Sequence, residues 1–212
     1  MEKEDAVIVL GAGDYPRHEV PQRLLRSACR VVCCDGAAEE YIRREGKLPW
    51  RIVGDGDSLG EEFKERYREI VRCFSEQENN DQTKATLYLM EHGVKEIVYL
   101  GATGRREDHT IGNVSLLVDY MNRGLRVKMY TDKGVFVPAR DRFSDEMLPE
   151  EVKNSQTISI FSFGAEKLRS SGLQYPLHDL NSWWQGTLNR ITDKHFTIEA
   201  KGCFLLYLPY KA

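Results

Sequence analysis

The hydrophobic positions in the first half of the chain follow one repeated pattern. A short apolar run leads into a glycine-rich or acidic turn, and an amphipathic helical stretch follows. The apolar runs are AVIVL (6–10), RVVCC (30–34), WRIVGD (50–55), EIVYL (96–100) and LRVKMYT (125–131). Strands that alternate with helices at this spacing indicate βαβ units and a mainly parallel sheet. We therefore predict an α/β fold whose N-terminal domain is Rossmann-like.

The helical pattern fades near residue 140. A charged segment, ARDRFSDEMLPEEVKNS (139–155), reads as a loop, and short alternating runs follow it: TISIFSF (157–163), HFTIEA (195–200) and CFLLYLP (203–209). Short alternating runs that are separated by glycine and polar turns favour a small all-β unit, a sandwich or a half-barrel, and we predict a β-sandwich domain. We predict two domains, 1–140 and 141–212.

Composition narrows the class of partner. The 212 residues carry a formal net charge of -3, with acids and bases mixed along the chain, so no basic stripe predicts a nucleic-acid partner. No apolar run approaches the ~20 residues that a membrane span needs. The start, MEKED, has acids where a signal peptide has basic residues. Five cysteines, two of them adjacent in an apolar run, favour reduced thiols over disulfides. We predict a cytoplasmic protein without a membrane or nucleic-acid partner.

The stretch GDGDS (54–58) carries two aspartates, Asp55 and Asp57, directly after an apolar run. On an extended segment residues two apart point to the same side, so both carboxylates could converge on one object. A Mg2+ ion that bridges phosphates requires such oxygen ligands. A polar turn with an aspartate helix cap explains the stretch about as well, and similar pairs occur in glycosyltransferases and phosphatases.

Other polar turns also follow predicted strands. Asp35 and Gly36 come directly after the second run, where the aspartate could cap a helix, line a ligand crevice, or do both. Asp81, Thr83 and Lys84 crowd the start of a predicted helix, where exposed backbone N–H groups favour anions. The lysine is unfavourable for the helix itself, which hints at a phosphate nearby, although a solvated lysine is the simpler explanation.

The richest stretch is GATGRREDHTIGN (101–113). Gly104 allows close backbone approach, and Arg106 can fork onto phosphate oxygens. Asp108 and His109 open a helix whose next turn presents Asn113. Because ligands of open parallel sheets bind beyond the carboxyl ends of the strands, these turns are expected to line one crevice.

Four motifs in this order, CDGA, GDGDS, NDQTKA and GATGRREDH, closely resemble the thiamine pyrophosphokinase family. The later segments SSGLQYPL (170–177) and GTLN (186–189) resemble that family's thiamine-binding β-domain. The resemblance covers almost the whole chain. It implies transfer of the pyrophosphoryl unit of ATP to the hydroxyl of thiamine, with release of AMP. ATP is then the co-substrate, and Mg2+ the metal.

The resemblance also implies residue roles. The metal ligands would be Asp55, Asp57 and Asp81, with Lys84 and Arg106 completing the catalytic group. Positions on or beside ATP would be Asp35, Gly36, Thr83, Gly104, Arg106, Asp108 and His109. Gln77 and Asn189 would touch thiamine. Domain 1–140 would then bind ATP and domain 141–212 thiamine. The identity of a general base stays open.

Three departures from the family pattern affect these expectations. Arg105 stands where the family often has a second glycine, and Leu188 replaces a serine near the thiamine site. The pair Trp183 and Trp184 is not part of the family pattern. Thiamine is cationic, so Trp184 or Trp183 could offer an aromatic face instead of the serine, or both could pack the core or a subunit contact.

The small β-domain and the resemblance together predict a homodimer, with the active site near the subunit interface. Two rival functions stay open. One is another Mg-dependent transferase with a DxD pair, such as a glycosyltransferase. The other is a non-catalytic thiamine or nucleotide sensor.

Overall fold

A computed structural model describes residues 6–211, which form two compact units. The first unit comprises residues up to 116 together with 123–132, and the second comprises 117–122 and 133 onward. A larger α/β part followed by a β part agrees with the prediction. The predicted boundary after residue 140 falls inside a strand of the second unit, Gly134–Ser144, because the start of this strand continues the apolar pattern.

The first unit is built on a parallel sheet with the strand order β4-β3-β2-β1-β5-β6. Every pairing between these neighbours is parallel. The strands are β1 (Val7–Leu10), β2 (Val31–Cys34), β3 (Arg51–Gly54), β4 (Val71–Cys73), β5 (Glu96–Leu100) and β6 (Arg126–Tyr130). β1 and β2 are buried along their whole length, as expected for a sheet covered on both faces.

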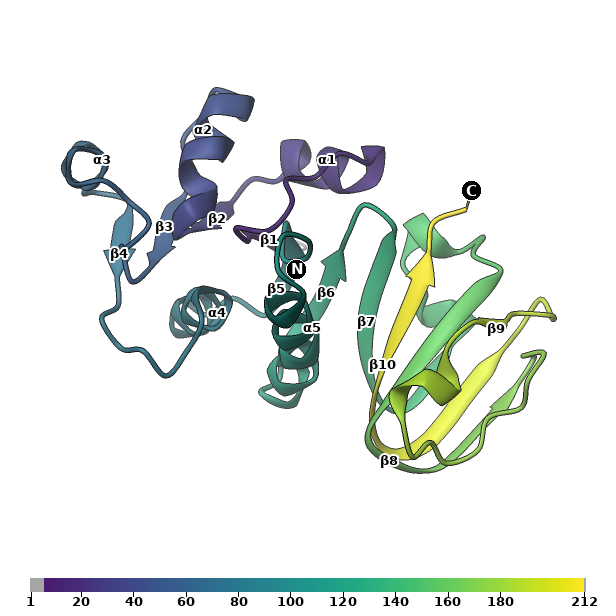
Figure 1. The fold of residues 1–212 in the computed structure, drawn as a ribbon. Helices are drawn as coiled ribbons and strands as arrows, with labels where there is room; N and C mark the ends of the chain where they lie inside the picture. Colours follow the sequence, from purple (N-terminus) through teal and green to yellow (C-terminus); the bar gives the residue numbers. More distant parts are fainter. Residues whose placement is uncertain (1–5, 212) are drawn as a thin grey trace. The chain divides into compact units, whose positions relative to one another are not determined.

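The helices of this part are α1 (Glu19–Ser27), α2 (Ala38–Glu45), α3 (Glu61–Arg66), α4 (Asp81–Glu91) and α5 (Glu107–Asn122), with a short 3-10 turn η1 (Asp35–Ala37) before α2. In Figure 1, α2 and α4 lie on opposite sides of the sheet. Gly46, with a φ of 65°, ends α2 in the left-handed conformation. No helix within residues 6–211 is long and apolar enough to cross a bilayer.

The strand order reverses at β1, which pairs with β2 on one side and with β5 on the other. At such a switch point the loops after neighbouring strands turn in opposite directions and leave a crevice beyond the carboxyl ends. The glycine loops after β1 and β5 begin at this point. The fold therefore places the predicted ligand site between these loops.

The second unit is an antiparallel sheet with the order β7-β10-β8-β9. Its strands are β7 (Gly134–Ser144), β8 (Thr157–Ser171), β9 (Asn189–Arg190) and β10 (Thr197–Pro209), with 3-10 turns η2 (Asp145–Met147), η3 (Glu150–Val152) and η4 (Trp183–Gly186). The β character is confirmed, and the finer class of sandwich stays a prediction.

Two details of this unit differ from the sequence prediction. Residues 139–144, taken as part of a charged loop, form the end of β7, with Arg140 to Arg142 exposed and Phe143 buried. The runs at 195–200 and 203–209 mostly belong to one strand, β10, whose register shifts between Glu199 and Cys203. Gly202 lies at this irregularity with a φ of 115°, which explains why the alternation breaks without ending the strand.

Candidate active site

A cleft of about 430 Å3 lies at the carboxyl edge of the parallel sheet. Its lining comes from the loops after β1, β3 and β5, from the start of α4, and from α5. It includes residues 11–13, Cys34, Asp55, Ser58, residues 79–82, Lys84, Ala102, residues 104–106, His109 and Asn113. The turns after β1, β3 and β5 therefore share one crevice, whereas Asp35 and Asp57, which were expected there, do not line it.

The glycine loops after β1 and β5 bind each other through their backbones. Gly13 N donates to Gly101 O at 2.7 Å, and Asp14 N donates to Thr103 O at 2.8 Å. A Cβ at Gly13 would lie 2.3 Å from Thr103 O, so any side chain there would separate the loops. Gly101 and Gly104 have φ values of 59° and 80°, in the left-handed region that favours glycine. These glycines fix the shape of one wall of the cleft.

Asp35 is almost completely buried, with 1% of its surface exposed. Its Oδ2 accepts a hydrogen bond from Gly56 N, while Oδ1 has no hydrogen-bond partner among the described residues. Burial is the main cause that raises the pKa of Asp35 to about 6. The nearby carboxylates of Asp81 and Asp55 contribute to this rise, and the Gly56 N–H opposes it. Asp35 does not cap η1 or line the cleft; it lies against Gly54 and Gly56 and holds the GDGDS turn.

The two aspartates of GDGDS lie differently. Strand β3 ends at Gly54, and Gly56 turns the chain with a φ of 84°. Asp55 lines the cleft, whereas Asp57 is exposed and donates its backbone N–H to Asp55 Oδ1 at 3.0 Å. That bond, followed by the charge of Lys84, lowers the pKa of Asp55. The premise that both aspartates lie on an extended segment is wrong, because β3 ends at Gly54, before the first of them.

Lys84 is 3% exposed, and its ammonium group lies between two carboxylates. Its Nζ is 3.8 Å from Asp55 Oδ2 and 4.0 Å from Asp81 Oδ1. Burial and the charge of Asp55 raise the pKa of Asp81. A buried lysine is stable only when it is paired, so these contacts hold Lys84 at the cleft.

The start of α4 is fixed by Asn80, whose side chain accepts a hydrogen bond from Thr83 N at 2.9 Å. Helix α4 thus begins at Asp81, so this residue lies at the helix start as the sequence predicted. Thr83 is buried and does not line the cleft, although the resemblance placed it beside ATP. Residues 79–82 line the cleft with the N-terminal end of α4.

A polar network that the sequence did not reveal joins α4, α5 and the loop after β5. Asn80 Nδ2 donates to Asn113 Oδ1 at 2.9 Å, and Asn113 Nδ2 donates to Ala102 O at 2.9 Å. Gln82 Nε2 donates to Asn113 O at 3.1 Å, and Gln82 Oε1 has no partner among the described residues. The only sequence signal was the position of Asn113, one helical turn after His109.

Arg106 and His109 line the cleft, and Asp108 does not. The Arg106 guanidinium donates to both carboxylate oxygens of Asp108, at 3.1 and 2.6 Å. This pair, together with the backbone N–H of His109, lowers the pKa of Asp108 to about 2. Both side chains are largely exposed, so the pair orients the arginine more than it stabilises the fold.

The remaining residues that were predicted for the ATP and thiamine sites do not all line the cleft. Gly104 lines the cleft, whereas Gly36 and Gln77 are exposed and do not line it. In the second unit, Asn189 is buried, and its side chain accepts from Tyr175 N and donates to Tyr175 O. These bonds fix the loop at Tyr175 against strand β9.

The two tryptophans differ in their surroundings. Trp183 Nε1 donates to Ser162 O at 3.0 Å, and its ring lies 5.3 Å from that of Phe163. Trp184 is 73% exposed. Leu188 is also exposed, with a φ of 57°. Trp183, which is 42% exposed, therefore packs partly within the second unit, and Trp184 is the more accessible of the two to a ligand or a partner.

The donor set of the cleft fits magnesium. No group of three or more acidic, histidine or cysteine side chains within residues 6–211 is arranged as a metal cage. Magnesium on a nucleotide usually takes one or two carboxylates, phosphate oxygens and water. Asp55 and Asp81 supply such oxygens. Burial and then the charge of Asp55 raise the pKa of Asp81, and a bound cation would offset this repulsion between the two carboxylates.

The fold and the cleft together define an α/β protein with an acidic, lysine-containing, glycine-lined site at the switch point of a parallel sheet. Residues 21–129 match the family model described as thiamin pyrophosphokinase, catalytic domain. Residues 134–207 match the model described as thiamin pyrophosphokinase, substrate-binding domain. The chain belongs to the thiamin pyrophosphokinase family.

Individual relatives agree with this assignment. The chain is 27% identical over 170 residues to thiamin pyrophosphokinase 1 of Caenorhabditis elegans, covering 75% of this chain and 69% of the relative. It is 25% identical over 152 residues to thiamine pyrophosphokinase of Bacillus subtilis, covering 68% of each.

Solved structures share the fold. A thiamine pyrophosphokinase from Bacillus subtilis superposes with a TM-score of 0.76 at 20% identity, covering 97% of this chain and 100% of the other. One from Candida albicans gives 0.77 at 18% identity, covering 98% and 90%.

Proposed function

We propose that this protein transfers the pyrophosphoryl group of ATP to the hydroxyl of thiamine, giving thiamine diphosphate and AMP. One observation carries the proposal. In a chain whose two parts both match thiamin pyrophosphokinase domains, Asp55, Asp81 and Lys84 meet in one cleft at the carboxyl edge of the sheet. The cleft contains the charges that a triphosphate and its metal require.

Residues 6–132 would supply the ATP site. Lys84 and Arg106 would hold phosphate oxygens, and the backbone of the loops after β1 and β5 would let the phosphates approach closely. Asp55 and Asp81 would hold Mg2+, which neutralises charge on the phosphates when bound. Asp57 is exposed and does not line the cleft, so its place among the metal ligands stays a prediction.

Pyrophosphoryl transfer depends mainly on the positioning of the two substrates, and it needs no covalent intermediate with the protein. The thiamine hydroxyl must approach phosphorus in line with the bond to the leaving AMP. Asp35 supports this arrangement indirectly, because it fixes the GDGDS turn from behind through Gly56 N. His109 and Gly104 complete the lining near the phosphates.

The second unit would bind thiamine, with Trp184 as an aromatic face. Gln77, in the first unit, is a further thiamine contact implied by the family resemblance. Trp184 and Leu188 are both exposed apolar side chains, which supports a surface here that a ligand or a second copy of the chain covers. We propose a homodimer in which a second copy completes the thiamine site. A cytoplasmic location stays a prediction.

The proposal is tested by incubating the protein with ATP, Mg2+ and thiamine and separating the products. Thiamine diphosphate and AMP in equal amounts are expected. A parallel incubation with nucleotide sugars and Mg2+ tests the rival glycosyltransferase, which would release a nucleoside diphosphate there and form no thiamine diphosphate from ATP. Binding of thiamine and ATP without any product would indicate a sensor.

A further inference from the structure

Arg105 lies in the loop after β5 with an unusual backbone conformation. Its φ is 58°, in the left-handed region that residues other than glycine rarely adopt. Such a conformation persists in a protein only where the surroundings hold it, and it often marks a functional position. Arg105 lines the cleft, and 56% of its side-chain surface is exposed.

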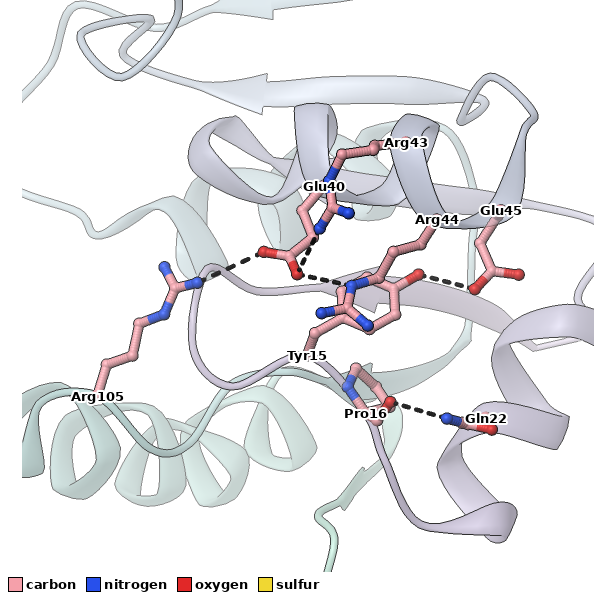
Figure 2. A network of polar contacts seen from close by, with 8 residues as sticks. All are labelled: Tyr15, Pro16, Gln22, Glu40, Arg43, Arg44, Glu45 and Arg105. Atoms are coloured by element: carbon pink, nitrogen blue, oxygen red, sulfur yellow. Dashed lines mark hydrogen bonds and ion pairs between the residues drawn. The ribbon is translucent and has the colours of Figure 1, made fainter.

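The contact that holds the Arg105 side chain is long and shared. Figure 2 shows its guanidinium reaching Glu40 of α2, with Nη2 3.7 Å from Glu40 Oε2. Glu40 Oε1 already accepts hydrogen bonds from Arg44 Nε at 2.6 Å and from Arg43 Nη2 at 3.3 Å. The Glu40 carboxylate thus contacts three guanidinium groups, and its contact with Arg105 is the longest.

Arg44 has a second contact, with the Tyr15 ring, which holds its guanidinium beside the Glu40 carboxylate. Its guanidinium lies 4.7 Å from the centre of the Tyr15 ring, and Tyr15 Oη donates to Glu45 at 3.0 Å (Figure 2). Of the three arginines on Glu40, Arg105 is the one that lines the cleft. An exposed ion pair of this length is weak, so little opposes the release of Arg105 toward another anion.

The neighbouring arginine faces a stronger competitor. Arg106 is bound to both oxygens of Asp108, with the shorter contact at 2.6 Å. A phosphate that recruits Arg106 must share it with that carboxylate or replace it. A phosphate that recruits Arg105 displaces only the 3.7 Å contact with Glu40.

We propose that Arg105 is a further phosphate-binding residue of the cleft, which leaves Glu40 when a nucleotide polyphosphate binds. The planar guanidinium matches two phosphate oxygens and gives the left-handed residue a function. The choice of ATP as ligand rests on the proposed function. Glu40 acts as a competitor that holds Arg105 at the cleft mouth until the anion arrives.

The direct test uses a non-hydrolysable ATP analogue with Mg2+ and isothermal titration calorimetry, so that binding is read without turnover. Arg105→Gly relieves the backbone strain, and its thermal midpoint should equal or exceed that of the wild type. Its dissociation constant should rise by about tenfold or more, since a charged hydrogen-bonding partner is lost. Arg43→Ala removes another arginine from Glu40 outside the cleft and should leave the constant unchanged.

A double-mutant cycle tests the role of Glu40. Glu40→Gln should tighten analogue binding by about two- to fivefold, the size expected for an exposed ion pair, and this gain should vanish in the Arg105→Gly background. An Arg105→Gly protein that binds like the wild type, or a Glu40→Gln effect of equal size in both backgrounds, would overturn the inference.

Its failure and that of the proposed function are distinguishable. A wild type that binds the analogue through Arg105 and makes no thiamine diphosphate would refute only the function. A wild type that makes thiamine diphosphate while Arg105→Gly binds normally would refute only the inference. A wild type that does not bind the analogue would refute both.

Discussion

The carboxyl group of Asp35 occupies the space that a side chain at Gly54 would need. A Cβ on Gly54 would lie 2.3 Å from Asp35 Cγ and 2.8 Å from Oδ2. The two residues stand at the carboxyl ends of the adjacent strands β2 and β3. The first glycine of GDGDS is therefore a steric requirement of the buried aspartate beside it.

Gly54→Ala should destabilise the protein, because Asp35 must leave its position or the strands must separate. The expected loss is about 1–3 kcal/mol of unfolding free energy, the usual size for overpacking. Urea denaturation measures it. Gly60→Ala is the matched control, since Gly60 has a φ of -65° and nothing within 4 Å of its Cβ. Equal stability of the two variants would show that the Asp35 contact is not restrictive.

Asp55→Asn should lower turnover by at least ~100-fold, because it removes charge from the proposed metal and from the neighbour of Lys84. Asp57→Asn should cost less, because its carboxylate is exposed and does not line the cleft. Steady-state rates at saturating Mg2+, with circular dichroism as the folding control, separate them. Equal losses would mean that the GDGDS turn rearranges when substrate binds.

Arg106→Lys should weaken the use of ATP although the charge is kept, because an ammonium group cannot contact two oxygens in one plane. We expect the Michaelis constant for ATP to rise by about tenfold, the size of one lost charged hydrogen bond. Arg126→Lys is the control: Arg126 also contacts a carboxylate, Glu96, but lies outside the cleft. Similar constants for both variants would remove Arg106 from the ATP site.

Substitutions of Trp183 and Trp184 should have different effects on thiamine use and on stability. Trp184→Leu should raise the Michaelis constant for thiamine with little loss of stability, because Trp184 is mostly exposed. Trp183→Leu should mainly lower the melting temperature, because it removes the bond to Ser162 and the contact with Phe163. Sedimentation of both variants tests the dimer. A fully active monomer would contradict a thiamine site shared between subunits.

The sequence predicted the parts of the site that follow from strand ends. Asp55 and Arg106 are 51 positions apart, yet both could be assigned to one cleft, because parallel strands end at one edge. Asp81, at the start of a helix, was assigned to the cleft only through the family resemblance. The depth of Asp35 could not be predicted, since it depends on the missing side chain at Gly54 in the next strand. The bond between Asn80 and Asn113 depends on how two helices pack, which no local pattern records. The left-handed conformation of Arg105 could not be predicted, because residues other than glycine rarely have a positive φ. The sequence indicated only an arginine at a position where the family often has glycine.

The most direct test of the account is to follow two labels of ATP in the presence of Mg2+ and thiamine. ATP labelled on the β-phosphate and ATP labelled on the γ-phosphate are used in parallel, and the thiamine product is isolated. The account predicts that both labels enter the product in equal amounts, with one AMP released per thiamine diphosphate. A product that carries only the γ-label, with release of ADP, would contradict pyrophosphoryl transfer.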